Sequence, residues 1–562
     1  MTAPVLSRRS LLAVTAAGFA APWLSRPAVA AAIPDFVDDY RSNLTANLTV
    51  DTNAAVRILS GVQKYWRTGS AWNTGTVLDR ATLRANVRFC ETRTASRTAA
   101  EGARAFVVDR QHQSYAVIAG LGPWAAAYRT AALAVTGITE APATTPATTV
   151  SDFVPAGAPA GATNGAGSPT SELGQIVTLV NTVRGNWSSS NPGKFAVQYP
   201  RPWRMTTDST VVDTGAVDEF GFPVYRSKVV VVPQLLRQRG LTPADDGGFP
   251  SGHTNALFLA ALSFAYAFPE RYQELLTTAF DLADTRITAG MHSPLDVVSG
   301  RILATALAAA ILNDPVNVEL KAAARAQAQA FLAANSPTTT DGYADRAANR
   351  RSILPRLTYI LPRTGRDKPL TVPKGAEVLL ETRQPYLTAA QRRAVLRSTA
   401  LPAGYALLDG PEQWGRLDLY KAADGYGAFE SDVDVTIDVD DVWRNDISGP
   451  GGLTKRGTGT LTLTGANTFR GGIRILGGTL AGSLGRGDLE IRGGLRLARP
   501  QKAKNVTIGA GSTLVVEVGK PGVFPALSAD RVTGKFARVT APGFKAEAIY
   551  TRDSVKVKVS KA

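Results

Sequence analysis

The chain has 562 residues, of which 44% are hydrophobic and 19% are charged, and its formal net charge is +16. A chain of this length exceeds what one hydrophobic core supports, so two or three domains are expected. The basic balance indicates an anionic partner or simply a basic protein, and the sequence has no zinc-finger spacing and no RNA-binding aromatic signature. The single cysteine, Cys90, excludes a disulfide framework within the chain.

Residues 1–30 have the pattern of an export signal. Arg8 and Arg9 stand before a modest apolar run over 11–24, and a small-residue cleavage site follows at 28–30. The arginine pair is typical of a twin-arginine signal, with an ordinary secretory signal as the alternative. We therefore expect an exported protein that is periplasmic, secreted or displayed on the cell surface, and a mature chain that lacks these residues.

Residues 31–335 carry apolar side chains at spacings of three and four, which predicts a helical domain. The apolar stretch 301–312 falls short of the roughly 20 residues that cross a bilayer, so we expect no transmembrane segment in the mature chain. Residues 336–440 are mixed in pattern and are expected to extend this domain. A short helix is predicted there after the capping box Thr388–Gln391.

Residues 441–562 differ in texture, because small or polar residues alternate with apolar ones and Gly-Gly pairs recur. Period two with regular glycine turns predicts short strands, and their repetition predicts a stack like a β-solenoid. The segment GTGTLTLTGANTF at 457–469 resembles the autotransporter-associated β-strand repeat of bacterial surface proteins. The expected fold is therefore multidomain, an all-α helical domain followed by a small all-β, β-solenoid-like C-terminal region.

Two of the three histidines precede long apolar helical runs, which places them near helix N-termini, where free N–H groups favour an anion. His253 lies in FPSGHTNALFLAAL and His292 lies in RITAGMHSPLDVVSG. Asp296 stands four residues after His292, which on a helix puts both side chains on one face. A carboxylate on one ring nitrogen fixes the tautomer and leaves the other nitrogen able to attack. Spacing alone leaves open which histidine is the nucleophile, and the aspartate favours His292.

Basic residues complete a three-part pattern that runs in one order along the chain. The parts are Lys194-x6-Arg201-Pro202, then Pro250-Ser251-Gly252-His253, then Arg286-x5-His292-x3-Asp296. This order resembles the signature of the type 2 phosphatidic acid phosphatase superfamily, which includes bacterial class A acid phosphatases and vanadium haloperoxidases. One residue departs from it, since Thr285 stands where serine is usual, but the hydroxyl is retained.

The resemblance implies a role for each matching residue. His292 would be the nucleophile and carry the phosphoryl group, Asp296 would orient it, and His253 would protonate the leaving oxygen and later help to activate water. The phosphoryl oxygens would be held by the side chains or backbone N–H groups of Lys194, Arg201, Ser251, Gly252 and Arg286. Three fixed cations would then replace the metal ions used elsewhere, and no carboxylate cluster accompanies the motifs, so we expect no metal and no cofactor.

These residues predict an exported, metal-independent acid phosphatase that hydrolyses small phosphate monoesters through a phosphohistidine. One alternative is a vanadium-dependent haloperoxidase with vanadate as cofactor, although residues 244–249 lack the additional histidine that such enzymes place before the Pro-Ser-Gly-His motif. Another is a surface or adhesion protein that acts through the β-repeat. We expect no nucleic-acid partner, and association with the cell surface through the repeat.

Overall fold

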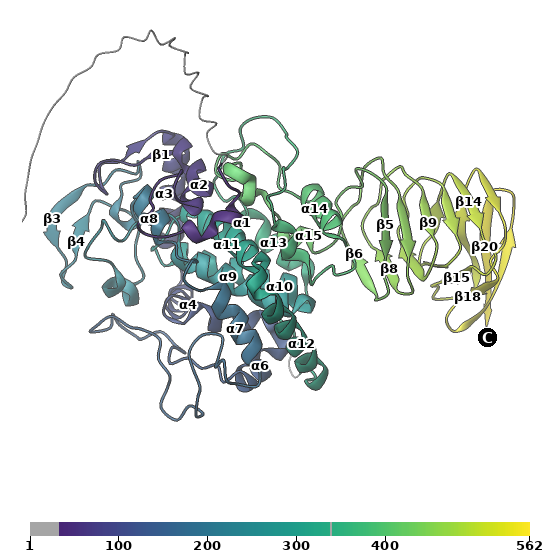
Figure 1. Cartoon of the computed structure of the whole chain (residues 1–562), viewed down its shortest axis with the longest axis horizontal. Coiled ribbons are helices and arrows are strands. Elements are labelled where there is room, and N and C mark those ends of the chain that lie inside the picture. The colour runs from purple at the N-terminus through teal and green to yellow at the C-terminus, as the bar shows by residue number, and fades with distance from the viewer. Residues whose placement is uncertain (1–32, 338–339, 562) are drawn as a thin grey trace, which may run out of the picture. The chain divides into compact units, whose positions relative to one another are not determined.

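The computed structural model describes residues 33–337 and 340–561, so the expected export signal at 1–30 lies outside the described residues. Asp35–Ala562 forms one compact unit, in which helices come first and strands follow (Figure 1). The predicted fold class, a helical domain followed by a β-solenoid-like region, is confirmed, and the strands of the second region form parallel sheets.

Two long helices form the centre of the helical part because they are apolar on every side. α9 (Gly252–Ala267) and α11 (Pro294–Asn313) have buried side chains all around, which is typical of helices enclosed by others. α10 (Tyr272–Thr288) packs against α9. Around them lie α1 (Phe36–Asp39), α2 (Ala54–Leu59), α3 (Arg80–Ala95), α4 (Ala99–Arg110), α5 (Gln113–Val117), α6 (Ala125–Ala131), α7 (Gly174–Val183), α8 (Asn191–Val197) and α12 (Val318–Ala334).

α11 is longer than the apolar pattern at 301–312 indicated, because it begins at Pro294. Its 20 residues make it the one helix among the described residues that is long and apolar enough to cross a membrane, and its apolar window is fully buried inside the protein. The first turn of this buried helix holds Asp296, so the core of the domain fixes one side of the predicted site.

Short strands and a further group of helices complete the first part of the chain. β1 (Trp66–Arg67) pairs antiparallel with β2 (Thr76–Val77), and β3 (Asp213–Val217) with β4 (Pro223–Tyr225). The capping box predicted at Thr388 is confirmed, since its hydroxyl accepts from the Gln391 N–H at 3.2 Å and the Gln391 side chain accepts from the Thr388 N–H at 2.9 Å. Residues 336–440 contain α13 (Arg346–Arg356), α14 (Ala389–Ser398) and α15 (Leu419–Ala422).

The β region is a stack of coils in which the chain passes alternately between two six-stranded parallel sheets. Apolar side chains repeat at one register position, and this buried column is the core of the stack: Val433, Leu453, Ile473, Leu489 and Val506. One sheet consists of β5 (Val433–Thr436), β7 (Leu453–Arg456), β9 (Ile473–Ile475), β11 (Leu489–Ile491), β14 (Asn505–Ile508) and β17 (Arg531–Thr533). The other consists of β6 (Asp441–Trp443), β8 (Thr460–Leu463), β10 (Thr479–Gly482), β12 (Gly494–Leu497), β15 (Thr513–Val516) and β18 (Arg538–Thr540).

A smaller mixed sheet lies at the C-terminal end of the stack. Its strand order is β13-β16-β20-β19, with an antiparallel pairing of β16 and β19 to the long β20. The strands are β13 (Gln501–Lys502), β16 (Gly522–Ser528), β19 (Phe544–Tyr550) and β20 (Ser554–Lys561).

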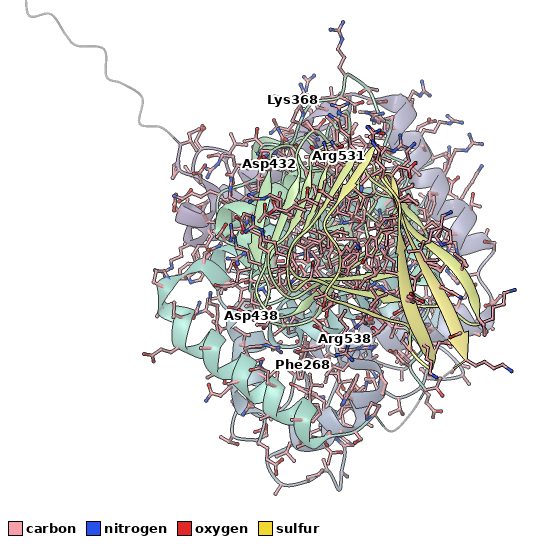
Figure 2. All side chains as sticks on the ribbon, turned by 90° about the vertical axis from the view of Figure 1, so that its right-hand side faces the viewer. Phe268, Lys368, Asp432, Asp438, Arg531 and Arg538 are labelled. Carbon is pink, nitrogen blue, oxygen red and sulfur yellow. The ribbon has the colours of Figure 1, made fainter. Side chains whose placement is uncertain are left out.

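The stack begins with β5 at Val433, earlier than the boundary expected at 441. The acidic stretch before 441 belongs to the first coil, and its carboxylates accept hydrogen bonds from backbone N–H groups of the second coil, 20 residues on. The bonds join Asp432 to Gly452, Asp438 to Thr458 and Asp440 to Thr460, at 2.7, 2.9 and 2.7 Å. Figure 2, which views the stack along its length, labels Asp432 and Asp438. These acidic residues therefore satisfy backbone donors and are part of the fold.

The segment before the stack packs onto the first coil. Arg383 holds Asp441 through two hydrogen bonds of 2.9 and 3.0 Å, and the Tyr386 hydroxyl bonds to the same carboxylate. Trp443 is fully buried, donates to the Tyr386 hydroxyl at 2.8 Å and packs against the ring of Tyr426. Partly buried charged contacts and buried aromatic contacts therefore anchor the first coil to the preceding segment.

Candidate active site

The structure brings the predicted site residues together at the ends of four helices. Arg286 lies in the last turn of α10, because that helix continues to Thr288. The others lie in α8 (Lys194), before the turn Pro202–Arg204 (Arg201), at the start of α9 (Ser251, Gly252 and His253) and at the start of α11 (His292 and Asp296).

His292 lies between a carboxylate and a guanidinium. Its Nδ1 is 3.4 Å from Asp296 Oδ2, and its Nε2 is 2.8 Å from Arg201 Nη1. Arginine can only donate, so Nε2 is the nitrogen with the lone pair and Nδ1 carries the proton toward Asp296. The expected closeness of His292 and Asp296 is present, but its cause is different. His292 precedes the helix, and the two meet because the Asp296 carboxylate turns back to accept the Ser293 N–H at 2.8 Å.

His253 is held by a residue that the sequence did not indicate. Its Nε2 is 3.0 Å from the backbone carbonyl oxygen of Asp109, at the end of α4. A carbonyl only accepts, so Nε2 donates and Nδ1 is the nitrogen that can take up a proton. Burial, together with the charge of Arg286, lowers the pKa of His253 to about 3, so this histidine is neutral in the free site above that pH.

Two carboxylates absent from the predicted set pair with two of the expected phosphate-binding cations. The Asp109 carboxylate forms a fully buried ion pair with Arg286. The Asp246 carboxylate accepts from Arg201 Nε at 3.1 Å and from Arg204 Nη2 at 3.0 Å. Although burial opposes ionisation, these arginines lower the pKa of both carboxyl groups. In the site without ligand, two of the cations are therefore paired with carboxylates of the protein itself.

The loop before the Pro-Ser-Gly-His motif also fixes Lys194 and closes on Asp296. The Lys194 ammonium donates to the carbonyl oxygen of Gly247, and the Gly248 N–H donates to the Tyr199 carbonyl at 2.7 Å. A Cβ at Gly248 would lie 2.9 Å from the Pro200 carbonyl and 3.0 Å from Asp296 Oδ2, so a glycine is needed for this approach. This close packing joins the first and third parts of the pattern through the loop that precedes the second part.

The start of α9 supplies the remaining expected donors. The Ser251 hydroxyl oxygen caps the helix, accepting from the Thr254 N–H at 3.3 Å and the Thr254 hydroxyl at 3.0 Å, and its own hydrogen is not used in these contacts. Gly252 is the first residue of the helix, where backbone N–H groups are available to an anion. Thr285, the departure from the pattern, donates to the Leu282 carbonyl of its own helix at 2.6 Å.

Burial and like charge shape the electrostatics of the pocket. Burial and the nearby charges of Arg201 and Lys194 lower the pKa of His292, so its imidazole is neutral. Burial, reinforced by Arg201, lowers the pKa of Lys194, and burial raises the pKa of Asp296. A bound anion would raise the pKa values of His292 and Lys194 again, because it favours the charged form of every cation around it.

Two buried polar atoms of the site have no hydrogen-bond partner within the described part of the chain, Arg286 Nε and Asp296 Oδ1. An orphaned guanidinium donor beside a histidine and a second arginine marks a place where a ligand oxygen would be satisfied. Across residues 33–337 and 340–561, no group of three or more His, Cys, Asp or Glu side chains is arranged to hold a metal ion.

Comparison with known protein families matches residues 174–319 to the PAP2 superfamily. The match contains every residue of the three-part pattern. Residues 174–319 form a PAP2 superfamily domain. A second match, to the passenger-associated-transport-repeat, covers residues 453–481, which are β7 to β10 of the stack. Both resemblances inferred from the sequence are confirmed at the level of the family.

Curated relatives are similar to parts of the chain. A non-specific acid phosphatase of Salmonella typhi is 43% identical over 56 residues, which are 10% of this chain and 22% of the relative. The Neisserial autotransporter lipoprotein NalP of Neisseria meningitidis is 39% identical over 111 residues, 19% of this chain and 10% of the relative. An extracellular serine protease of Serratia marcescens is 32% identical over 145 residues, 19% of this chain and 14% of the relative. The chain thus spans less than a quarter of the length of each of these proteins.

Proposed function

We propose that the protein is an exported, metal-independent acid phosphatase that hydrolyses phosphate monoesters through a phosphohistidine. The observation that carries the proposal is the arrangement of His292, whose Nδ1 faces Asp296 at 3.4 Å while its Nε2 meets Arg201 at 2.8 Å. A neutral imidazole held in this tautomer presents a lone pair beside a cation that attracts phosphate. The PAP2 domain and the similarity to a non-specific acid phosphatase support a phosphatase.

Phosphoryl transfer spreads negative charge over three equatorial oxygens, and fixed donors stabilise that charge. Lys194, Arg201 and Arg286 would supply three cations, with the orphaned Arg286 Nε as one donor to a phosphoryl oxygen. The Ser251 hydroxyl and the Gly252 N–H would add two donors at the start of α9. This set supplies the charge that metal ions supply in other phosphatases, so we propose a reaction without a metal or other cofactor.

In the proposed reaction, the lone pair on His292 Nε2 forms a bond to phosphorus, and the bond from phosphorus to the ester oxygen breaks. The leaving oxygen takes a proton from His253, which then helps water to release phosphate from His292. Asp296 stabilises the positive charge that develops on the His292 ring. Because His253 is neutral in the free site above about pH 3, its proton enters with the monoanionic ester or is taken up when the dianion binds.

Export and surface display are part of the proposal. The twin-arginine pattern at 8–9 and the passenger-associated-transport-repeat at 453–481 support a periplasmic, secreted or cell-surface location. The similarity to an autotransporter lipoprotein and to an extracellular protease supports the same location. Small phosphate esters would be the substrates, and the repeat would associate with the cell surface.

The test compares His292→Ala with His253→Ala on p-nitrophenyl phosphate and on an alkyl phosphate. His292→Ala removes the nucleophile, so turnover of both esters should fall by several orders of magnitude. His253→Ala removes the acid, which is typically worth about 10²–10⁴-fold, so the aryl ester with its good leaving group should suffer less than the alkyl ester. Rapid denaturation in SDS at alkaline pH, with ³²P-labelled aryl ester as the substrate, should trap phosphate on His292 in the His253 variant, because phosphohistidine is stable in base and labile in acid.

Three outcomes would contradict the proposal. Phosphate trapped on His253 would exchange the two roles. Equal loss on both esters in both variants, without trapped phosphate, would remove the support for a phosphohistidine. The same wild-type preparation is assayed with vanadate, bromide and hydrogen peroxide, because halide oxidation without ester hydrolysis would assign the site to a haloperoxidase.

A further inference from the structure

The positive charge of the protein is concentrated in the strand stack beyond its first coil. Residues 448–562 contain 19 Lys and Arg against six Asp and Glu, a net charge of +13 out of the +16 of the whole chain. All of these basic side chains except Lys455 are exposed. Figure 2 shows Arg531 and Arg538 on the strand stack at its C-terminal end. The charge that the sequence left unexplained thus belongs to the repeat and not to the phosphatase site.

Of the exposed cations between 448 and 561, three on or next to the first sheet are paired, whereas Arg496, Arg531 and Arg538 in the strands and the cations on one edge of the stack are not. Arg456 pairs with Asp434, and Arg474 and Arg492 both pair with Glu490. The edge where the chain returns from the second sheet to the first carries exposed cations that form no ion pair with any described residue. They are Arg470, Arg486, Arg499, Lys502, Lys504 and Lys520.

Two of these edge cations, Arg470 and Arg486, stand at one register position on neighbouring coils, and Lys502 lies in the same return of the coil that follows. The Arg470 N–H donates to the Gly449 carbonyl at 3.0 Å, and the Arg486 N–H donates to the Phe469 carbonyl at 3.3 Å, which aligns Arg486 with Arg470. On the next coil, Lys502 lies in β13, which pairs with β16, and the Lys504 N–H donates to the Gly487 carbonyl at 3.0 Å. Neighbouring strands lie about 4.8 Å apart, so Arg470 and Arg486 begin a row of cations along this edge, which Lys502 and Lys504 extend on the next coil.

A row of unpaired like charges opposes the stacking that produces it, because like charges directly opposite on neighbouring strands are destabilising. A bound chain with a negative charge at each step would remove that repulsion, and guanidinium groups bind carboxylate, sulfate and phosphate through paired hydrogen bonds. We propose that this edge, defined by Arg470, Arg486 and Lys502 with Arg499, Lys504 and Lys520 beside them, binds a linear anionic polysaccharide.

Two other polyanionic partners fit the surface less well. Single-stranded nucleic acid is bound on exposed aromatic side chains, and every aromatic residue between 448 and 561 is buried or half-buried. A membrane surface requires several apolar side chains beside the basic ones, and between 448 and 561 the large exposed apolar residues are Val523 and Ile549 alone. An anionic polysaccharide can bind to a row of cations without aromatic or apolar side chains beside them.

The experiment uses the full mature chain and two triple variants with the same change in net charge. The first replaces the row, Arg470→Gln, Arg486→Gln and Lys502→Gln. The matched control replaces the paired cations, Arg456→Gln, Arg474→Gln and Arg492→Gln. Binding is measured against immobilised polygalacturonate and heparin, with neutral dextran, poly-dT and vesicles containing phosphatidylglycerol as further probes, at several salt concentrations. Turnover of p-nitrophenyl phosphate and circular dichroism report that the variants are folded.

The wild-type protein should bind polygalacturonate and heparin but not dextran, with an affinity that falls steeply with salt. The row variant should lose at least tenfold in affinity and show a shallower salt dependence, whereas the control should change less than threefold. Equal losses in both variants would mean that net charge alone matters and would overturn the site. Tighter binding of poly-dT or of the vesicles, lost in the row variant, would overturn the polysaccharide assignment. The outcome does not depend on the phosphatase, whose turnover should be the same in all three proteins.

Discussion

Replacing Asp109 by asparagine should destabilise the helical domain and make its stability depend on phosphate. The side chains of Asp109 and Arg286 are 0% and 1% exposed, so the substitution leaves a buried guanidinium without its counter-ion. Removing one partner of a buried ion pair costs about 3–5 kcal/mol. Asparagine keeps an oxygen acceptor at the same place, so we expect a loss of about 3 kcal/mol, at the low end of that range.

Bound phosphate should restore part of the lost stability, because it would bring negative charge to Arg286. A ligand at a concentration of about 100 times its Kd stabilises the folded state by about 2.7 kcal/mol. The variant should bind phosphate more tightly than the wild type, since no internal carboxylate competes for the arginine. Urea unfolding followed at 222 nm, with and without inorganic phosphate, measures both effects.

The matched control is Asp341→Asn, which breaks an ion pair outside the site. Asp341 accepts from Arg271 at 2.6 and 3.0 Å, so this variant should also lose stability. Phosphate should stabilise it by the same amount as the wild type. A loss below about 1 kcal/mol in Asp109→Asn would refute the assigned ion pair, against the expected cost of breaking one. Equal stabilisation of Asp109→Asn and the wild type by phosphate would refute the link between Arg286 and phosphate.

Three further outcomes are expected. First, kcat/KM should fall as pH rises through the second pKa of the ester, about 6, because burial and Arg286 keep His253 neutral above about pH 3. For an ester with a lower second pKa, the pH at which kcat/KM falls should be lower by the same amount. If kcat/KM fell at one fixed pH for all esters, the titrating group would belong to the protein and not to the ester. Second, a chain that ends at residue 450 should keep its kcat, because it retains the Asp441 and Trp443 contacts, whereas a chain ending at 440 should be less stable. A soluble, folded chain to 450 without activity would contradict the independence of the two parts. Third, dialysis against EDTA should leave turnover unchanged, and a loss that a divalent metal restores would overturn the three-cation site.

The local patterns of the sequence were sufficient for the fold class and for the families. Apolar spacing of three and four predicted the helices, and alternation with Gly-Gly turns predicted the strand stack, because each pattern depends on neighbours in the chain. The boundary of the strand stack was harder to predict from the sequence. The first coil was missed because its Asp residues look like a polar segment until their carboxylates are seen to accept N–H groups 20 residues on.

The composition of the expected site also came from the sequence, since the three motifs contain the histidines and cations that phosphate chemistry needs at short, readable spacings. How those residues are held came only from the tertiary structure. Asp246 lies four residues before Pro250, so an acidic residue beside a basic motif was a signal that could have been read. Asp109 gave no such signal, because it reaches Arg286 across 177 positions. A contact between residues so far apart in the sequence depends on how α4 packs against α10. That packing depends on the whole core, whereas a motif consists of neighbouring residues and can be recognised in the sequence.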